Sequence, residues 1–158
     1  MRNFDIEEYL NIARGVGIFN NIDIQVLREV LEEYRRAPET DYFLIDEKRE
    51  GKLLGYIIFC RTPITEFSWD IFWLMVDKEW QGKGIGKKLI IELEKFIFKT
   101  DERAILRVET STKKEYSHAR NLYSKQGFNE VGRIPDFYAE GDDLIIYFKN
   151  TKETPERL

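Results

Sequence analysis

The chain has 158 residues, of which 42% are hydrophobic and 34% charged, and its formal net charge is −4. This length and apolar content predict one compact domain at residues 1–150, followed by a polar tail at 151–158. The acidic balance argues against a nucleic-acid or anionic-membrane binder and favours amine-bearing partners. With a single cysteine, Cys60, and no apolar run long enough to span a membrane, the sequence indicates a cytoplasmic protein without internal disulfides.

The N-terminal part of the chain is predicted to be helical. Residues 5–14 form a short helix, and Asp23 caps a second helix whose apolar residues recur with helical spacing. Pro38 prevents that helix from continuing. Two strands follow at 41–46 and 53–61, joined by a charged turn that contains glycine.

The remaining two thirds of the chain alternate between strands and helices. In chain order we expect a strand at 68–77, a helix at 84–99, a strand at 103–109, a helix at 115–126 that ends at Gly127, and two strands at 128–134 and 143–149 linked by a loop at 135–142. This order predicts an α/β (α+β) fold, with a mixed sheet of about six strands and helices on both faces.

Residues 73–89 are the most informative segment, because an apolar run leads into a glycine-dense turn and then into a helix-forming stretch. Gln81, Gly84 and Gly86 have the spacing Gln-x-x-Gly-x-Gly. A strand that enters a helix through such a turn directs several backbone N–H groups and the positive helix terminus at one point, which suits a diphosphate. The spacing of the glycines in this turn matches neither the Walker loop nor the dinucleotide-binding fingerprint. A turn that binds no ligand needs only one or two glycines, whereas this turn has three, so the composition argues against that alternative.

The sequence resembles the GNAT family of N-acetyltransferases in two blocks. The glycine turn matches the family pattern Gln/Arg-x-x-Gly-x-Gly/Ala. The second block, Ala-x-x-Leu-Tyr-x-x-x-Gly-Phe, consists of Ala119, Leu122, Tyr123, Gly127 and Phe128. The resemblance covers about residues 15–150 and implies the mostly antiparallel GNAT sheet. Only Met1–Phe4 precede the first helix, so the first strand of the family should be very short or missing.

The resemblance also implies acetyl-CoA as a co-substrate. Its expected contacts are Leu74, Met75 and Val76 on the strand, and Gln81, Gly82, Lys83, Gly84, Ile85, Gly86 and Lys87 in the loop. The strand backbone would pair with the amides of the pantetheine arm and polarise the thioester carbonyl, while the loop N–H groups would hold the diphosphate. For the lysines, solvated surface charges are an equally good interpretation.

Three side chains are candidates for proton transfer. An alkylamine is protonated at pH 7, so attack on a thioester needs a base. Asp70 lies six residues before Val76, and Glu109 ends the next strand; the resemblance implies a glutamate base at one or the other position. It also implies that Tyr123 is the general acid that protonates the thiolate. Asp70 is expected to have a catalytic or substrate-binding role. The structural alternatives are a solvated strand end for Glu109 and a core aromatic for Tyr123.

A segment near the C-terminus, Arg133–Asp143, is rich in acids and aromatics and has two interpretations. In one, it is a substrate loop in which Asp136, Tyr138, Glu140 and Asp142 recognise an amine and Arg133 a carboxylate. In the other, it is only a connection shaped by proline and glycine.

The predicted activity is acetyl transfer from acetyl-CoA to a primary amine of a small molecule, an amino acid or a peptide or protein N-terminus, by direct attack in a ternary complex. A non-catalytic acyl-CoA-binding regulator with the same fold, and an enzyme for bulkier acyl groups, are the alternatives. Family members often have asparagine where this chain has Tyr116, which leaves the coenzyme contact of that helix open. His118, the only histidine, suits a solvent-facing position, and no Cys/His cluster indicates a metal. A homodimer is compatible with all of these features.

Overall fold

The computed structural model describes residues 1–152, and its elements confirm the predicted α/β class. The helices are α1 (Ile6–Val16), α2 (Asn21–Arg36), α3 (Ile85–Ile97) and α4 (Ser117–Lys125), with short 3₁₀ turns η1 (Lys78–Trp80) and η2 (Lys114–Tyr116). The strands are β1 (Tyr42–Arg49), β2 (Lys52–Arg61), β3 (Ser68–Val76), β4 (Arg103–Ser111), β5 (Asn129–Ala139) and β6 (Asp142–Lys152).

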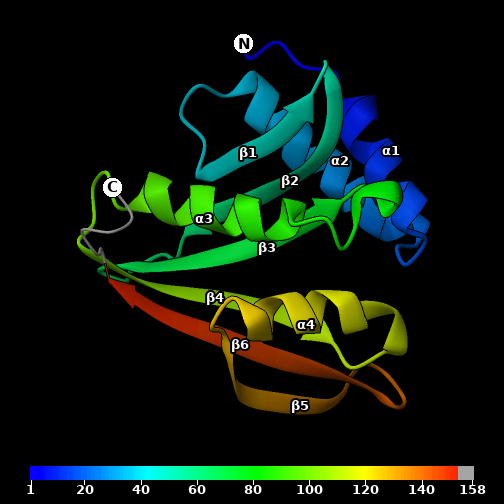
Figure 1. Cartoon of the computed structure of the whole chain (residues 1–158), viewed down its shortest axis with the longest axis vertical. Coiled ribbons are helices and arrows are strands. Elements are labelled where there is room, and N and C mark those ends of the chain that lie inside the picture. Colours follow the sequence, from blue (N-terminus) through cyan, green and yellow to red (C-terminus); the bar gives the residue numbers. More distant parts are fainter. Residues whose placement is uncertain (153–158) are drawn as a thin grey trace. The chain divides into compact units, whose positions relative to one another are not determined.

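The six strands form one mixed sheet in the order β1-β2-β3-β4-β6-β5 (Figure 1). β1–β2, β4–β6 and β5–β6 are antiparallel, whereas β3 and β4 are parallel. No strand precedes α1 among the described residues, so the first strand of the family is missing here, as the sequence predicted.

The chain divides into two compact units. The first unit contains Met1–Cys60 and Trp73–Leu89, and the second unit contains Arg61–Phe72 and Ile90–Leu158. Strand β3 and helix α3 each contribute residues to both units. A single domain at residues 1–150 therefore stays a prediction, and residues 153–158 of the predicted tail lie outside the described part.

In the first unit, α1 and α2 pack on one face of β2. Asn20 caps α2 and forms a reciprocal capping box with Asp23, so the predicted cap at Asp23 is wrong by three residues. The reason is that Asp23 occupies the third helical position, where its carboxylate bonds back to the Asn20 N–H. Alternation along the strand points Tyr56 and Ile58 into the core cluster formed with α1 and α2.

The opposite face of β2 carries Gly55, where another residue would not fit. A Cβ at this position would lie 2.6 Å from the carbonyl oxygen of Met75 and 3.1 Å from the Cγ2 atom of Ile85. Both distances are below ordinary van der Waals contact, so only glycine allows β2, β3 and the start of α3 to pack this closely. The close packing fixes the position of β3 immediately before the glycine turn.

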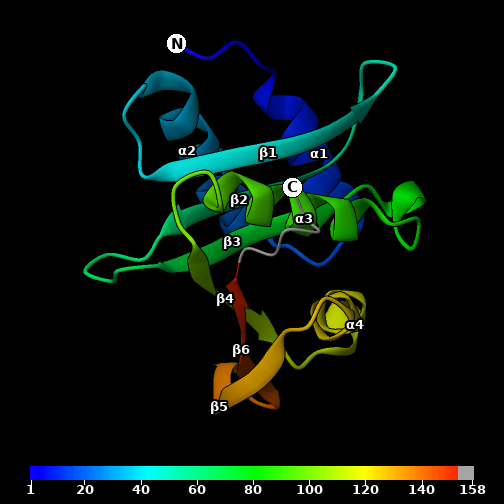
Figure 2. The same ribbon diagram turned by 60° about the vertical axis from the view of Figure 1, so that its left-hand side comes forward.

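In the second unit, β4, β6 and β5 form a three-stranded antiparallel part of the sheet, and α4 lies against one of its faces (Figures 1 and 2). The predicted loop at 135–142 is wrong, because β5 and β6 extend to a tight turn at Glu140–Gly141, where Gly141 has φ +76°. The β5–β6 register is interrupted between Ile134 and Ala139. Pro135 is tolerated there because an unpaired stretch of an edge strand does not need its N–H.

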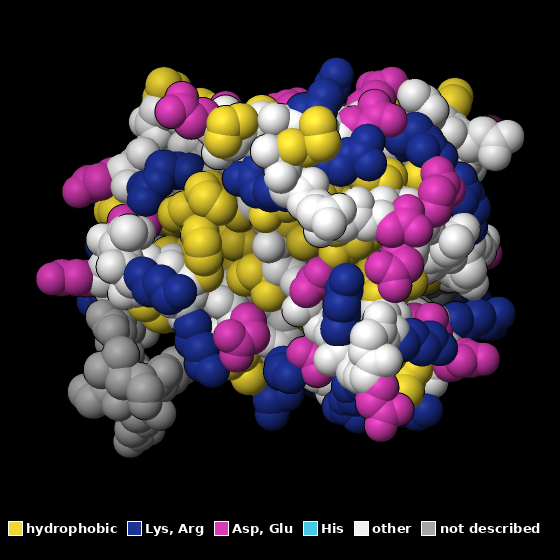
Figure 3. All heavy atoms as spheres, turned by 90° about the horizontal axis from the view of Figure 1, so that it is seen from above, with side chains coloured by type: hydrophobic (Ala, Val, Ile, Leu, Met, Phe, Trp, Pro, Cys, Tyr) yellow, Lys and Arg dark blue, Asp and Glu magenta, His cyan; other side chains and the backbone are white. Residues whose placement is uncertain are grey.

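Surface charges of both signs are mixed on the face drawn in Figure 3, with hydrophobic side chains visible between them. No large field of one sign covers that face, in agreement with the near balance of acids and bases in the sequence. Among residues 1–152, no helix has both the length and the apolarity needed to cross a membrane.

Candidate functional site

The end of β3 is fixed by hydrogen bonds within the first unit. The Asp77 N–H donates to the carbonyl oxygen of Leu54 (2.9 Å), and the Glu79 N–H donates to the Asp77 carboxylate (2.9 Å). The side-chain amide of Gln81 donates to the carbonyl oxygen of Val76 (3.3 Å). The glutamine of the motif thus ties the glycine turn to the strand through its own side chain.

The turn itself depends on the backbone freedom of glycine. Gly82 has φ +72° and Gly84 has φ +85°, and no atom lies within 4 Å of a Cβ placed at either position. Other L-residues are strained in this conformation, so glycine is needed here for its backbone and not for space. Helix α3 then begins with a bond from the Lys88 N–H to the Gly84 carbonyl oxygen (3.0 Å).

Because α3 begins there, the N–H groups of residues 85–87 have no acceptor within the helix. The first turn of α3 contains no acidic residue. Lys83 lies 4.9 Å from the centre of the Trp80 ring, and Lys88 pairs with Glu47 (2.7 Å). N–H groups without a helical acceptor at a helix N-terminus are suited to a diphosphate, so these residues fit the coenzyme that the resemblance implies.

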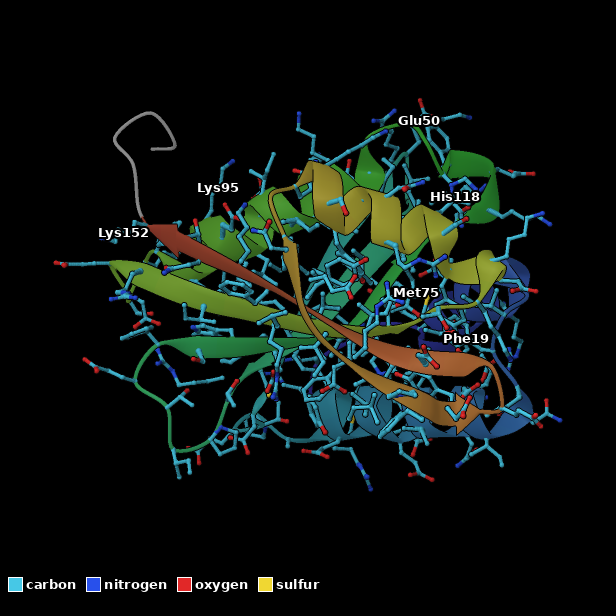
Figure 4. The ribbon with its side chains drawn as sticks, turned by 90° about the horizontal axis from the view of Figure 1, so that it is seen from below. Phe19, Glu50, Met75, Lys95, His118 and Lys152 are labelled. Atoms are coloured by element: carbon cyan, nitrogen blue, oxygen red, sulfur yellow. The ribbon has the colours of Figure 1, made fainter. Side chains whose placement is uncertain are left out.

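Met75 on β3, one of the expected coenzyme contacts, has only its main chain available to a ligand. The side chain of Met75, labelled in Figure 4, belongs to the core cluster of the first unit and is 4% exposed. Leu74 and Val76 are half-buried. Any contact of Met75 with a ligand would therefore come from its peptide group, as expected for an added extended segment.

Asp70 lies in the second unit, directly opposite Arg107 in the parallel pair β3–β4. Its Oδ1 atom accepts a hydrogen bond from Arg107 Nε (2.5 Å), and its Oδ2 atom accepts one from Thr62 Oγ1 (2.8 Å). The Asp70 side chain is 12% exposed and that of Arg107 is 49% exposed. Both oxygens of Asp70 are thus engaged, and its charge is balanced by a guanidinium.

Glu109 follows Arg107 by two residues on β4, so both side chains project from the same face of the strand. The residue is exposed, and within residues 1–152 its carboxylate has neither a hydrogen bond nor an ion pair. It lines a pocket of about 230 Å³ in the second unit. The lining residues of this pocket, which we call the acidic pocket, are Asp70, Ile71, Phe72, Arg107, Glu109 and Tyr138.

Tyr123 is buried on α4, with its ring 5.6 Å from that of Phe128 and 5.9 Å from that of Tyr147. The Phe128 N–H donates to the Tyr123 carbonyl oxygen (3.0 Å) and the Gly127 N–H to that of Ser124 (3.2 Å), which is a Schellman motif. The family block Tyr-x-x-x-Gly-Phe therefore ends α4 and fixes the tyrosine ring. Burial raises the pKa of Tyr123, so its phenol keeps a proton at neutral pH.

Three charged residues of the Arg133–Asp143 segment have partners within the second unit. Asp142 is buried and accepts a hydrogen bond from Ser111 Oγ, and Asp136 accepts one from the Gly141 N–H (2.7 Å). Arg133 pairs with Glu130. These partners favour the connection interpretation for Asp136, Asp142 and Arg133, whereas Tyr138 lines the acidic pocket.

His118 and Cys60 occupy ordinary structural positions. His118, labelled in Figure 4, is exposed on α4, and Cys60 is buried on β2. Within residues 1–152 no group of three or more His, Cys, Asp and Glu residues is arranged to hold a metal ion.

Comparisons with known proteins identify the family. Residues 38–130, more than half of the chain, match the family model described as an acetyltransferase (GNAT) domain. The chain belongs to the GNAT family. An uncharacterized N-acetyltransferase of Methanocaldococcus jannaschii is 28% identical, and the match covers 83% of this chain and 88% of that protein. The family membership confirms the predicted enzyme class, an N-acetyltransferase.

Solved structures of GNAT proteins share the fold. A protein assigned to the family from Desulfovibrio desulfuricans has a TM-score of 0.84 at 28% identity, covering 92% of this chain and 91% of that one. An aminoglycoside 6′-N-acetyltransferase complexed with coenzyme A has a TM-score of 0.74 at 16% identity, covering 98% of both chains. The latter comparison supports the GNAT fold alone.

Arg107 and Thr62 both bond to Asp70, and neither was among the site residues predicted from the sequence. Arg107 could have been found, because the period of two along β4 puts it on the same face as Glu109. Thr62 carried no such signal, since it precedes β3 and reaches Asp70 through the turn between β2 and β3. Both residues matter because their hydrogen bonds occupy the two carboxylate oxygens of Asp70.

Proposed function

We propose that the protein transfers an acetyl group from acetyl-CoA to a primary amine by direct attack in a ternary complex, without an acyl-enzyme. The observation that carries the proposal is the Gln81–Gly86 turn on a GNAT chain, with positive φ at Gly82 and Gly84 and the first N–H groups of α3, which have no acceptor within the helix, directly after it. In this role residues 81–87 bind the diphosphate, and the main chain of residues 74–76 binds the pantetheine amides and the carbonyl of the acetyl thioester.

Acetyl-CoA supplies an activated acyl group, whose carbon–sulfur bond breaks as the amine nitrogen forms the new carbon–nitrogen bond. The amine must lose one proton and the departing thiolate must gain one. Glu109 takes the proton of the amine, directly or through a water molecule. Tyr123 gives a proton to the thiolate and regains one from solvent.

Glu109 is a better base than Asp70 because its carboxylate is not committed to another group in the described chain. Asp70 already accepts hydrogen bonds from Arg107 and Thr62. A proton taken by Asp70 would weaken both bonds and leave the guanidinium facing a neutral acid. We therefore assign Asp70 to positioning Arg107 in the acidic pocket.

Two measurements test the proposal. Calorimetric titration should show that the protein binds acetyl-CoA, and a panel of amines, amino acids and peptides should include acceptors that cause thiol release. Failure to bind acetyl-CoA would overturn the whole proposal. Tight binding without turnover across the panel would instead favour the non-catalytic acyl-CoA-binding regulator. Faster turnover with longer acyl thioesters would point to an enzyme for bulkier acyl groups.

A further inference from the structure

The charges of the acidic pocket add up to a site for one cation. Its lining contains two carboxylates, Asp70 and Glu109, and one guanidinium, Arg107. Arg107 Nε bonds to Asp70 at 2.5 Å, so these two charges balance each other. Glu109 supplies the remaining negative charge. A second positive group on the ligand would meet no further carboxylate in this lining.

The rim of the acidic pocket is aromatic and exposed. Phe72 on β3 is 50% exposed and Tyr138 on β5 is 49% exposed, and both line the pocket. Phe137, 53% exposed, packs edge to face on Tyr138 with 5.1 Å between ring centres. Large side chains exposed together beside a pocket are unusual on a monomer surface, and they offer apolar area to a ligand.

The phenol of Tyr138 adds a polar group to this rim. Partial burial, and next the charge of Glu109, raise the pKa of Tyr138. Its hydroxyl therefore stays protonated at neutral pH and can donate a hydrogen bond. The carboxylate and the aromatic surfaces thus lie in one pocket, with the charge on β4 and the apolar surface on β3 and β5.

The size of the pocket limits how much of a ligand can enter. Its volume of about 230 Å³ is below the roughly 300–1,000 Å³ of sites that enclose a drug-sized ligand. Only one end group of an acceptor therefore fits, with its amine and the first apolar group attached to it. A multi-ring amino sugar would have to leave most of its charged groups outside.

We infer that the acceptor is a primary amine carried on an apolar, preferably aromatic, group, with no second cation nearby. This inference rests on the proposed function and specifies its substrate class. Glu109 binds the ammonium group and then takes its proton, while Phe72 and Tyr138 cover the apolar group. The polycationic acceptor named in the aminoglycoside 6′-N-acetyltransferase fold relative should be a poor substrate here.

The test compares kcat/KM for three amines with acetyl-CoA, measured by thiol release: 2-phenylethylamine, propylamine and the aminoglycoside kanamycin. We expect phenylethylamine to exceed both others by about tenfold or more, in the range that hydrophobic pockets achieve. Phe72→Ala and Tyr138→Ala should lower kcat/KM for phenylethylamine about tenfold and that for propylamine much less. Tyr138→Phe should restore the preference, and Val131→Ala, an exposed change elsewhere on β5, should leave it unchanged.

The outcomes separate this inference from the proposed function. Equal turnover of phenylethylamine and propylamine, or a preference for kanamycin, would overturn the substrate class and leave acetyl transfer intact. A phenylethylamine preference that survives both alanine variants would also overturn it, because the selectivity would then reside outside the acidic pocket. Absence of turnover with every amine, despite bound acetyl-CoA, would overturn the proposed function and the inference with it.

Discussion

Asp70 and Arg107 face each other across the parallel strands β3 and β4, with 2.5 Å between Oδ1 and Nε. Replacing Asp70 with asparagine removes the charge that this guanidinium faces. We expect Asp70→Asn to lower the free energy of unfolding by about 1–2 kcal/mol, since bonds to charged groups are strong but Arg107 is half-exposed. Urea unfolding measures this loss. A variant that keeps full stability and loses all turnover would instead identify Asp70 as the base.

Glu109→Gln tests the residue that we assign as the general base. Its carboxylate is exposed and unpaired within the described chain, so stability should change by less than about 0.5 kcal/mol. Turnover should fall by about 10²–10⁴-fold, the usual effect of losing a general base. Raising the pH should recover part of the lost rate as more of the amine becomes neutral. A variant as active as the wild type would remove Glu109 from the mechanism.

Tyr123→Phe removes one hydroxyl and keeps the ring that packs on Phe128 and Tyr147. If the phenol protonates the thiolate, kcat should fall by about 10²-fold or more, while the dissociation constant of acetyl-CoA stays within a factor of about three. Steady-state kinetics and calorimetric titration measure the two quantities. Unchanged kcat on an accepted amine would show that Tyr123 is only a core aromatic.

Gly84→Ala tests the glycine turn, and Gly51→Ala is its matched control. Gly84 (φ +85°) and Gly51 (φ +79°) both have open space where the methyl group of alanine would lie, so alanine costs about 1–2 kcal/mol of backbone strain at either position. Gly51 lies in the β1–β2 turn. We expect similar losses of stability, but only Gly84→Ala should weaken acetyl-CoA binding, by about tenfold or more. Equal affinities in the two variants would contradict diphosphate binding at residues 81–87.

Buried tyrosines should make the protein sensitive to alkali. Burial raises the pKa of Tyr123 and of Tyr56 above the usual value near 10. The folded protein therefore holds these protons more tightly than the unfolded chain does. Their stabilisation is complete below pH 10 and is lost above it, by up to about 1.4 kcal/mol per pH unit for each phenol.

Urea unfolding between pH 8.5 and 11.5 checks this slope. Tyr123→Phe should show a shallower decline than the wild type, because one titrating group is gone. Identical slopes in the two proteins would mean that the Tyr123 phenol ionises equally easily in the folded and unfolded states.

The sequence was sufficient to predict the elements whose signals are local. The apolar spacing of α1 to α4, the alternation of the strands and the two glycine-containing blocks each depend on residues a few positions apart. Motif spacing was enough to predict the family, and glycine chemistry explains why Gly84 and Gly127 adopt positive φ. The loop prediction at 135–142 failed because proline and glycine signal a break, whereas β5 and β6 continue past an unpaired stretch and pair again at Ala139 and Asp142, beside the Glu140–Gly141 turn.

Only the tertiary structure decided which charges meet. Asp70 and Arg107 are 37 positions apart, and their ion pair exists because β3 and β4 run parallel in one register. That pairing leaves Glu109 as the uncommitted acid and puts it in one pocket with Phe72 and Tyr138. Local spacing encodes the phosphate-type turn, since its atoms come from consecutive residues. The acidic pocket combines residues from β3, β4 and β5, so long-range strand register determines its chemistry.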